Sequence, residues 1–164
     1  MYHDGLMFGL VPDDILYLKV GASLRARKPT ATANESQTQA WLNALLESTN
    51  HQVFVAVSDS SVVGWAVAER RISLSELYTA EITGLIVSSS VRRGGVGRLL
   101  VHAVEDWSRT EGLTRVVVRS NVNRSESHEF YPSVGFELTK TAHVYVKDLN
   151  GCNKPRDNGC EKTS

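Results

Sequence analysis

The sequence predicts an α/β domain whose central sheet is mixed but mostly antiparallel, with about four helices around it. Two apolar runs joined by a short polar turn predict an antiparallel hairpin. Later in the chain, a strand, a glycine-rich turn, an amphipathic helix and another apolar strand predict one parallel crossover. The chain has 164 residues, 41% hydrophobic and 22% charged, which is the composition of one globular domain.

The elements before the hairpin are predicted from start and stop signals. Residues 6–11 predict a short first strand. Pro12 and the acids that follow it begin a helix, which residues 28–30 (Lys-Pro-Thr) break. Residues 36–39 fit a capping box for a second helix. The apolar stripe of that helix consists of Trp41, Leu42, Leu45 and Leu46.

The hairpin and the crossover form the centre of the predicted fold. Residues 53–57 and 62–68 are the two hairpin strands, and residues 77–87 are the next strand. The helix over 96–109 has a 3.6-residue apolar period, and Gly112 ends it. Residues 115–119 then predict a short buried strand. A right-handed crossover makes this strand parallel to 77–87, and the pair splays apart.

The remaining chain completes one domain over residues 1–148. A short helix is predicted at about 121–131, capped most simply by Asn121 or Asn123. Two final strands are predicted at 136–138 and 144–146. Residues 149–164 are polar and aperiodic, and they predict a disordered tail.

Charge and cysteine content narrow the class of protein. Lys plus Arg equals Asp plus Glu, at 18 each, so nothing calls for a nucleic acid or an anionic membrane as partner. We see no secretory signal and no apolar run of membrane-spanning length. The two cysteines, Cys152 and Cys160, lie in the polar tail. We therefore expect a cytoplasmic protein, as a monomer or a homodimer.

The turn over residues 92–97, Arg-Arg-Gly-Gly-Val-Gly, predicts an anion site. It follows a strand and opens a helix, whose first N–H groups lack intrahelical partners. Arg92, Arg93 and Arg98 add full positive charges to the helix dipole. Glycines let the backbone approach a ligand closely. The turn is neither a P-loop, because no Gly-Lys-Ser/Thr follows, nor a Rossmann fingerprint.

Together, three motifs resemble those of the GNAT superfamily of acetyl-CoA-dependent N-acetyltransferases. The turn resembles the family's Gln/Arg-x-x-Gly-x-Gly/Ala phosphate loop. Residues 85–87, Leu-Ile-Val, match the preceding Leu-x-Val strand, and residues 130–136, Phe-Tyr-Pro-Ser-Val-Gly-Phe, match a downstream Tyr…Gly-Phe block. The order of elements from about 12 to 147 also matches. The resemblance implies a GNAT fold and direct acetyl transfer from acetyl-CoA, as co-substrate, to an amine.

The resemblance also implies which residues bind acetyl-CoA. The turn would hold the pyrophosphate, the strand would pair with the pantetheine arm, and a backbone N–H near Ile86 or Val87 would polarise the thioester. Asn121 lies at the end of the splayed strand, and Arg124 stands where many members carry a CoA-contacting Asn. The expected cofactor-binding residues are Leu85, Ile86, Val87, Arg92, Arg93, Gly94, Gly95, Val96, Gly97, Arg98, Asn121 and Arg124.

The chemistry requires one base and one acid. Glu81, on the strand that carries the acetyl site, is the expected base for the incoming ammonium. The alternative is that Glu81 is a solvent-facing or cross-strand paired carboxylate. Tyr131 is the expected acid for the leaving thiolate, although Pro132 should distort its helical turn. His128, one turn before Tyr131, is a less favoured candidate for the base. No metal is expected, because the five histidines are scattered.

The sequence does not identify the amine that accepts the acetyl group. A compact chain favours a small-molecule primary amine, for example an aminoglycoside- or polyamine-like one. Protein N-termini or lysines remain open as acceptors. So does a different class of protein, a non-catalytic acyl-CoA-binding regulatory module, which would need the turn but neither Glu81 nor Tyr131.

Overall fold

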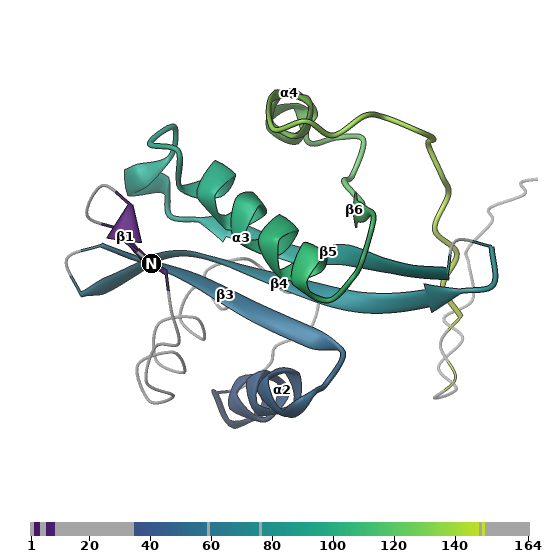
Figure 1. Ribbon diagram of the computed structural model, residues 1–164, viewed down its shortest axis with the longest axis horizontal. Helices are drawn as coiled ribbons and strands as arrows, with labels where there is room; N and C mark the ends of the chain where they lie inside the picture. The colour runs from purple at the N-terminus through teal and green to yellow at the C-terminus, as the bar shows by residue number, and fades with distance from the viewer. Residues whose placement is uncertain are drawn as a thin grey trace, which may run out of the picture.

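The computed structural model describes residues 2–3, 6–8, 35–58, 60–75, 77–147 and 149. Its strands form one sheet in the order β1-β2-β3-β4-β5-β6 (Figure 1). The strands are β1 (Tyr2–His3), β2 (Leu6–Phe8), β3 (His51–Ser58), β4 (Ser61–Ser73), β5 (Leu77–Val87) and β6 (Val116–Val118). The helices are α2 (Glu35–Glu47), the 3-10 helix η1 (Ser89–Val91), α3 (Val96–Thr110) and α4 (Ser125–Ser133).

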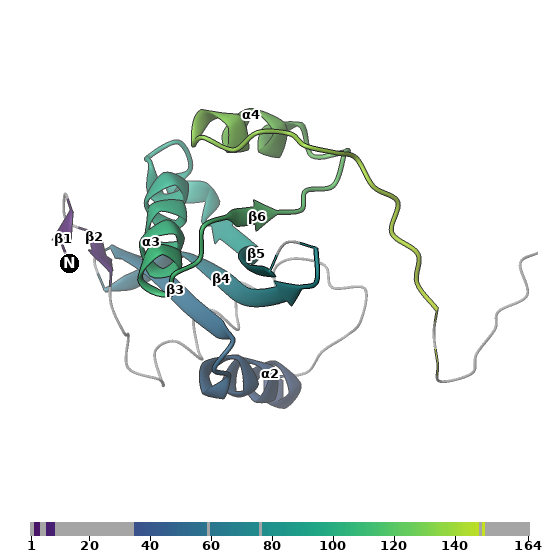
Figure 2. The ribbon, with the colours of Figure 1, turned by 45° about the vertical axis from the view of Figure 1, so that its right-hand side comes forward.

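Helices cover both faces of the sheet, which gives three layers. Helix α3 packs on one face and α2 on the other, while α4 lies beyond the N-terminal end of α3 (Figures 1 and 2). On the α3 face, Leu100, Val101 and Val104 are fully buried against Ala66 and Ile82 of the sheet. On the α2 face, Leu42 packs with Val55, Trp65 and Val67. No helix in the described part of the chain is long and apolar enough to cross a membrane.

Strand β5 carries an irregularity that positions the site. Val67 pairs with Gly84 and Ala68 with Ile82, so Thr83 is an extra residue, a β-bulge. The indole ring of Trp65 lies against Gly84, where a Cβ would come 2.8 Å from the ring. Because the bulge shifts the alternation by one residue, both Thr83 and Gly84 lie toward the α2 face.

The crossover from β5 through α3 to β6 is the only parallel connection among the described strands. Its pairing is short: Ala80 pairs with Val116, Glu81 with Val117 and Ile82 with Val118. Beyond Ile82, no described strand pairs with the outer edge of β5. The two parallel strands therefore separate at the bulge, which confirms the predicted splayed pair and the mixed, mostly antiparallel sheet.

Most predicted elements are confirmed, and two predictions are wrong. The described residues contain three of the four expected helices. Helix α4 begins at Ser125 instead of Asn121, because Asn121 and Asn123 form a turn of their own. The strands expected at 136–138 and 144–146 do not form: residues 137–147 are exposed, and no described strand pairs with them. The helix expected after Pro12 and the tail from 150 lie outside the described residues.

Candidate functional site

The glycine-rich turn begins where β5 ends. Helix η1 follows the strand, and the backbone of Arg92 after it is extended. Arg93 has a φ of 64°, in the left-handed region that residues other than glycine rarely adopt. Gly95 is also left-handed, with a φ of 82°, and it is the N-cap of α3. This backbone path brings the chain sharply from the sheet to the start of the helix and leaves three arginines, Arg92, Arg93 and Arg98, exposed.

The N-terminus of α3 presents free backbone donors. The first bond of the helix runs from Leu99 N–H to Gly95 O, at 3.0 Å, so the N–H groups of Val96, Gly97 and Arg98 have no partner within the helix. No side chain of the described residues caps this end, and the first turn contains no acidic residue. The helix dipole and the unpartnered N–H groups together favour an anion here.

The outer edge of β5 presents a second row of backbone groups. Ser88 N–H bonds to Val63 O at 2.8 Å, on the β4 side of the strand. Backbone groups alternate in direction along a strand, so the N–H groups of Leu85 and Val87 point away from β4, toward the open edge. The same register turns the N–H of Ile86 toward β4. Of the two donors expected from the sequence, Val87 therefore has the suitable orientation.

Helix α4 packs beside this turn through Gly97. A Cβ on Gly97 would lie 3.2 Å from the Phe130 ring and 3.7 Å from Val87 Cγ2, so this glycine lets α4 approach α3. Because the missing Cβ points at α4, a bulky residue at Gly97 would disturb packing as well as any ligand. The turn, the end of β5 and α4 are thus in direct contact.

The Tyr…Gly-Phe block is the C-terminal cap of α4. Phe136 N–H bonds to Tyr131 O at 3.0 Å and Gly135 N–H to Pro132 O at 3.1 Å, which is a Schellman motif. Gly135 has the left-handed φ, 91°, that the motif requires. The accompanying apolar contact joins the Tyr131 and Phe136 rings, whose centroids lie 5.6 Å apart. Tyr131 therefore lies in the last helical turn, as Pro132 predicts, but a defined cap fixes its ring.

Glu81 is buried and bound by two arginines. Arg71 donates to one carboxylate oxygen and Arg119 to the other. Glu81 pairs with Glu69 on β4 and with Val117 on β6, so both arginines are its diagonal neighbours two residues further along each strand. Its hydrogen bond and negative charge raise the pKa of Arg71. The resulting ion triad joins β4, β5 and the segment after β6.

Glu81 and Tyr131 lie on different sides of the sheet edge. Ile82 packs toward α3, so its neighbour Glu81 points to the α2 face. Phe130 and Phe136, which flank Tyr131, pack on the α3-face core. The space beside the open edge of β5 therefore has the carboxylate toward one face and the phenol-bearing helix toward the other.

Asn121 and Arg124 form the turn before α4. The Asn121 side chain accepts a hydrogen bond from Asn123 N–H at 2.9 Å, and Arg124 N–H bonds to Asn121 O at 3.0 Å. His128 Nε2 is 3.2 Å from the same Asn121 carbonyl. Arg124 is the N-cap of α4, without a side-chain cap bond, so the expected cap by an asparagine side chain is wrong.

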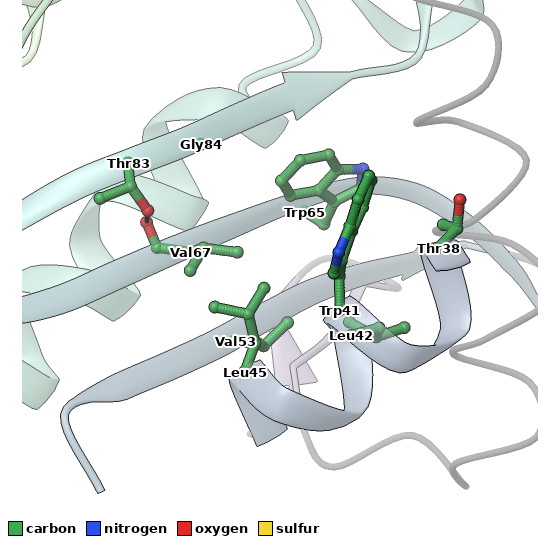
Figure 3. Close-up of a pocket in the computed structure, with 9 residues that line it drawn as sticks. All are labelled: Thr38, Trp41, Leu42, Leu45, Val53, Trp65, Val67, Thr83 and Gly84. Atoms are coloured by element: carbon green, nitrogen blue, oxygen red, sulfur yellow. Dashed lines mark hydrogen bonds between the residues drawn. The ribbon is translucent and has the colours of Figure 1, made fainter. Parts of the chain in front are cut away.

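A cavity of about 190 Å³ lies on the α2 face, between α2 and strands β3 to β5 (Figure 3). The bulge residues Thr83 and Gly84 form one wall, and Trp41 and Trp65 form another. Thr38, Leu42, Leu45, Val53 and Val67 complete the lining. The sequence motifs do not predict this cavity, and they assign Trp41 only to the apolar stripe of its helix. The different exposure of the two tryptophans, 57% for Trp41 and 6% for Trp65, depends on the packing of α2 on the sheet.

Comparison with known sequences decides the family. The family model of the GNAT acetyltransferases matches residues 22–136, well over half of the chain. The chain belongs to the GNAT acetyltransferase family. Two relatives are the uncharacterized N-acetyltransferase YhdJ of Bacillus subtilis (strain 168), 26% identical over 98 residues, and an aminoglycoside N(6')-acetyltransferase type 1 of Klebsiella aerogenes, 31% identical over 101. Each match covers 59% of this chain, and 69% and 66% of the relative.

Solved structures confirm the GNAT fold. The aminoglycoside N-acetyltransferase AAC(6')-Iy in complex with CoA superposes with a TM-score of 0.78 at 19% identity, over 87% of this chain and 94% of that one. The aminoglycoside acetyltransferase meta-AAC0020, from an uncultured soil metagenomic sample and in complex with sisomicin, gives 0.71 at 20% identity, over 88% and 97%. Membership of the family makes this GNAT domain an acyltransferase. Its fold is the same as that of solved structures that are only 19% and 20% identical to it in sequence.

We expect Arg98→Ala to weaken CoA binding roughly tenfold, the effect of losing about 1.4 kcal/mol of charge-assisted bonding to phosphate. Arg98 is exposed in the first turn of α3, so the protein should remain folded. Isothermal titration with CoA measures the change. Arg109→Ala is the matched control, because Arg109 is exposed at the other end of the same helix. Equal affinities for the two variants would contradict a phosphate site at the turn.

Proposed function

We propose that this protein transfers an acetyl group from acetyl-CoA to the primary amine of a small molecule. The observation that carries the proposal is the uncapped N-terminus of α3, with its exposed arginines, next to the open edge of β5. A diphosphate and an extended amide chain are the two parts of CoA that such a pair of features can bind. The family membership of the chain supports acyl transfer at this place.

We assign the pyrophosphate to the turn and the pantetheine arm to the strand edge. The backbone N–H groups of residues 95–98 would donate to the phosphates, with Arg92, Arg93 and Arg98 supplying charge. The pantetheine amides would pair with Leu85 and Val87, as an added strand does. Asn121 and Arg124 flank this path at the start of α4. We assign polarisation of the thioester carbonyl to a backbone N–H on the open edge, where Val87 and Leu85 have the suitable direction.

We assign the acceptor to the cavity on the α2 face. The cavity shares Thr83 and Gly84 with the bulge, where the open edge of β5 begins. A protonated amine can lie over an indole face, and the C–H faces of a sugar ring pack well against aromatic rings. An aminoglycoside- or polyamine-like amine fits these walls, and relatives named aminoglycoside acetyltransferases support that class.

The proposed reaction follows from this placement. The amine loses a proton on the α2 face, its nitrogen attacks the thioester carbon, and the C–S bond breaks as the amide forms. Glu81 is the proposed proton acceptor, and each of its oxygens keeps a lone pair beyond the one that accepts from Arg71 or Arg119. Tyr131 is the proposed donor of a proton to the departing thiolate on the α4 side. We expect both residues to act without a covalent enzyme intermediate.

A panel of amines with acetyl-CoA tests the function, with released thiol as the readout. We expect aminoglycosides or polyamines to accelerate release, and peptides to have little effect. Acceleration by peptides alone would point to protein acetylation. Acetyl-CoA binding without acceleration by any amine would favour the regulatory module.

We expect Trp41→Ala to raise the KM for the amine roughly tenfold, which corresponds to the loss of one cation–π contact of about 1–2 kcal/mol. The affinity for CoA should not change, because Trp41 lies on the opposite side of the sheet from α3. Leu46→Ala is the control, since Leu46 is partly exposed on the same helix but does not line the cavity. An unchanged KM for Trp41→Ala would remove the cavity from the acceptor site.

We expect Tyr131→Phe to reduce kcat by roughly 10²- to 10⁴-fold, as the loss of a general acid does. The ring contact with Phe136 and the cap of α4 do not need the hydroxyl, so folding should be preserved. Both KM values should stay close to those of the parent. A donor with a more acidic thiol should restore part of the rate. Tyr78→Phe serves as control, and near-parental kcat for Tyr131→Phe would exclude Tyr131 as the acid.

We expect Glu81→Gln to lower the rate most at low pH and progressively less as the pH rises. Without the base, only amine that is already deprotonated in solution reacts, and that fraction grows with pH. A pH profile of kcat/KM measures this, with Glu105→Gln as a control on α3. A deficit that stays constant across pH would mean that Glu81 acts by holding the strands through Arg71 and Arg119.

A further inference from the structure

We propose that the acceptor site takes a further class of amine, the α-amino acids with an apolar side chain, and that Arg119 selects them. Two features of the α2 face lead to this class: the ion triad of Arg71, Glu81 and Arg119, and the cavity beside α2. The inference rests on the proposed function, because it keeps the reacting amine at Glu81 and the thioester at the open edge of β5. It adds two groups that the site recognises, a carboxylate and an apolar side chain.

The cavity and the triad follow one another on the same face of β4 and β5. On β4, Val67 lines the cavity, and Glu69 and Arg71 come two and four residues later, with their side chains on the same face. On β5, Glu81 comes two residues before Thr83, which also lines the cavity. Thr83 Oγ1 donates to Val67 O at 3.4 Å, and the two residues form one end of the cavity (Figure 3). This end is therefore the one nearest to the triad.

The charged side chains of this face form a row of alternating sign. Arg71 lies between two carboxylates, because it donates to Glu81 and its Nε is 4.0 Å from Glu69. Arg119 ends the row, and in the part of the chain that the structure describes, Glu81 is its one ion partner. The Arg119 side chain is 65% exposed. Since a guanidinium has five N–H donors, Arg119 keeps donors for a further anion.

Arg119 also lies at the point where the parallel strands separate. Ile82 and Val118 are the last residues that pair between β5 and β6, and Arg119 is the next residue of the chain. On β5 the next residues are the bulge and then the open edge, where we place the thioester. An acceptor that approaches this edge from the α2 face therefore meets both charges of the Glu81–Arg119 pair.

This ion pair is complementary to a zwitterion. The ammonium of an amino acid can donate to a lone pair of Glu81 that the arginines leave free, while Arg119 donates to the carboxylate of the same molecule. Opposite charges on neighbouring groups of the acceptor thus match opposite charges on neighbouring side chains of the protein. An amine without the carboxylate meets Glu81 alone, so Arg119 distinguishes the two classes of acceptor.

The cavity specifies the side chain of the amino acid. Apart from Thr38 and Thr83, its lining is apolar, and its volume is about 190 Å³. An apolar cavity of roughly 150 Å³ can hold a benzene ring, so there is room here for one aromatic or branched aliphatic side chain. A charged side chain would lose its water without gaining a partner. Phenylalanine and leucine therefore suit the site, and glutamate does not.

The reaction balances in the same way as for other amines. The ammonium gives one proton to Glu81, and its nitrogen then bonds to the acyl carbon as the C–S bond breaks. The nitrogen loses a second proton as the amide forms, which balances the proton that the departing thiolate takes up. The products are an N-acetyl amino acid and CoA, and the carboxylate held by Arg119 takes no part in the bond changes.

A matched pair of substrates tests the role of Arg119. L-Phenylalanine and L-phenylalaninamide share the amine and the ring, and only the first has a carboxylate. With released thiol as the readout, we expect Arg119→Gln to lower kcat/KM for phenylalanine at least roughly tenfold and to leave the value for the amide nearly unchanged. Each substrate is compared between parent and variant, so the different basicity of the two amines cancels. Arg119→Lys, which keeps the charge but loses the fork, should have the smaller effect.

Controls separate this inference from folding and from the proposed function. Arg119→Gln should keep the parental circular dichroism and the parental affinity for CoA, and Arg109→Gln should leave both substrates unaffected, because Arg109 lies at the far end of α3. Equal losses on both substrates would show that Arg119 acts only through Glu81, and would refute the selection. Thiol release with aminoglycosides or polyamines but not with phenylalanine would refute this inference alone. Absence of release with every amine would overturn the proposed function as well.

Discussion

The short pairing between β5 and β6 is the constraint on which the rest of the site depends. Three residue pairs hold the parallel strands together, and the bulge at Thr83 ends that pairing. Before the bulge the backbone of β5 bonds to β6, as Ala80 N–H does to Arg115 O. After it, the same edge of β5 faces outward. The Arg71–Glu81–Arg119 triad stabilises the paired half at the last point before the strands separate.

Because of this arrangement, residues of β5 take part in the packing on both faces of the sheet. On the α2 face, the bulge widens β5 locally and leaves Gly84 free of a side chain under Trp65. On the α3 face, Val87 contacts the α3 start through Gly97, which also admits Phe130 of α4. In the proposed reaction, the substrate amine and the departing thiol would therefore lie on opposite sides of this edge, with the sheet between the two proton transfers.

Sequence patterns predicted the parts of the fold that are set locally. The helix after the glycines, the hairpin and the turn follow from periodicity and turn chemistry, and the Gly135 signal corresponds to a real cap. Patterns did not predict what depends on register or on distant partners. The two arginines on Glu81 come from diagonal positions on neighbouring strands, and the apolar residues at 144–146 have strand composition but pair with no strand in the described part of the chain. Composition specifies a preference for pairing, and it does not specify the partner.

The ion pair between Arg92 and Glu126, 3.6 Å apart, has a consequence for the state without ligand. It joins the turn over residues 92–97 to the first turn of α4, so a carboxylate of the protein neutralises one of the positive charges that we propose to bind phosphate. Both side chains are largely exposed, so the pair is weak and easily exchanged. In the binding mode proposed above, a phosphate at Arg92 would displace Glu126, and this would release the beginning of α4 from the turn.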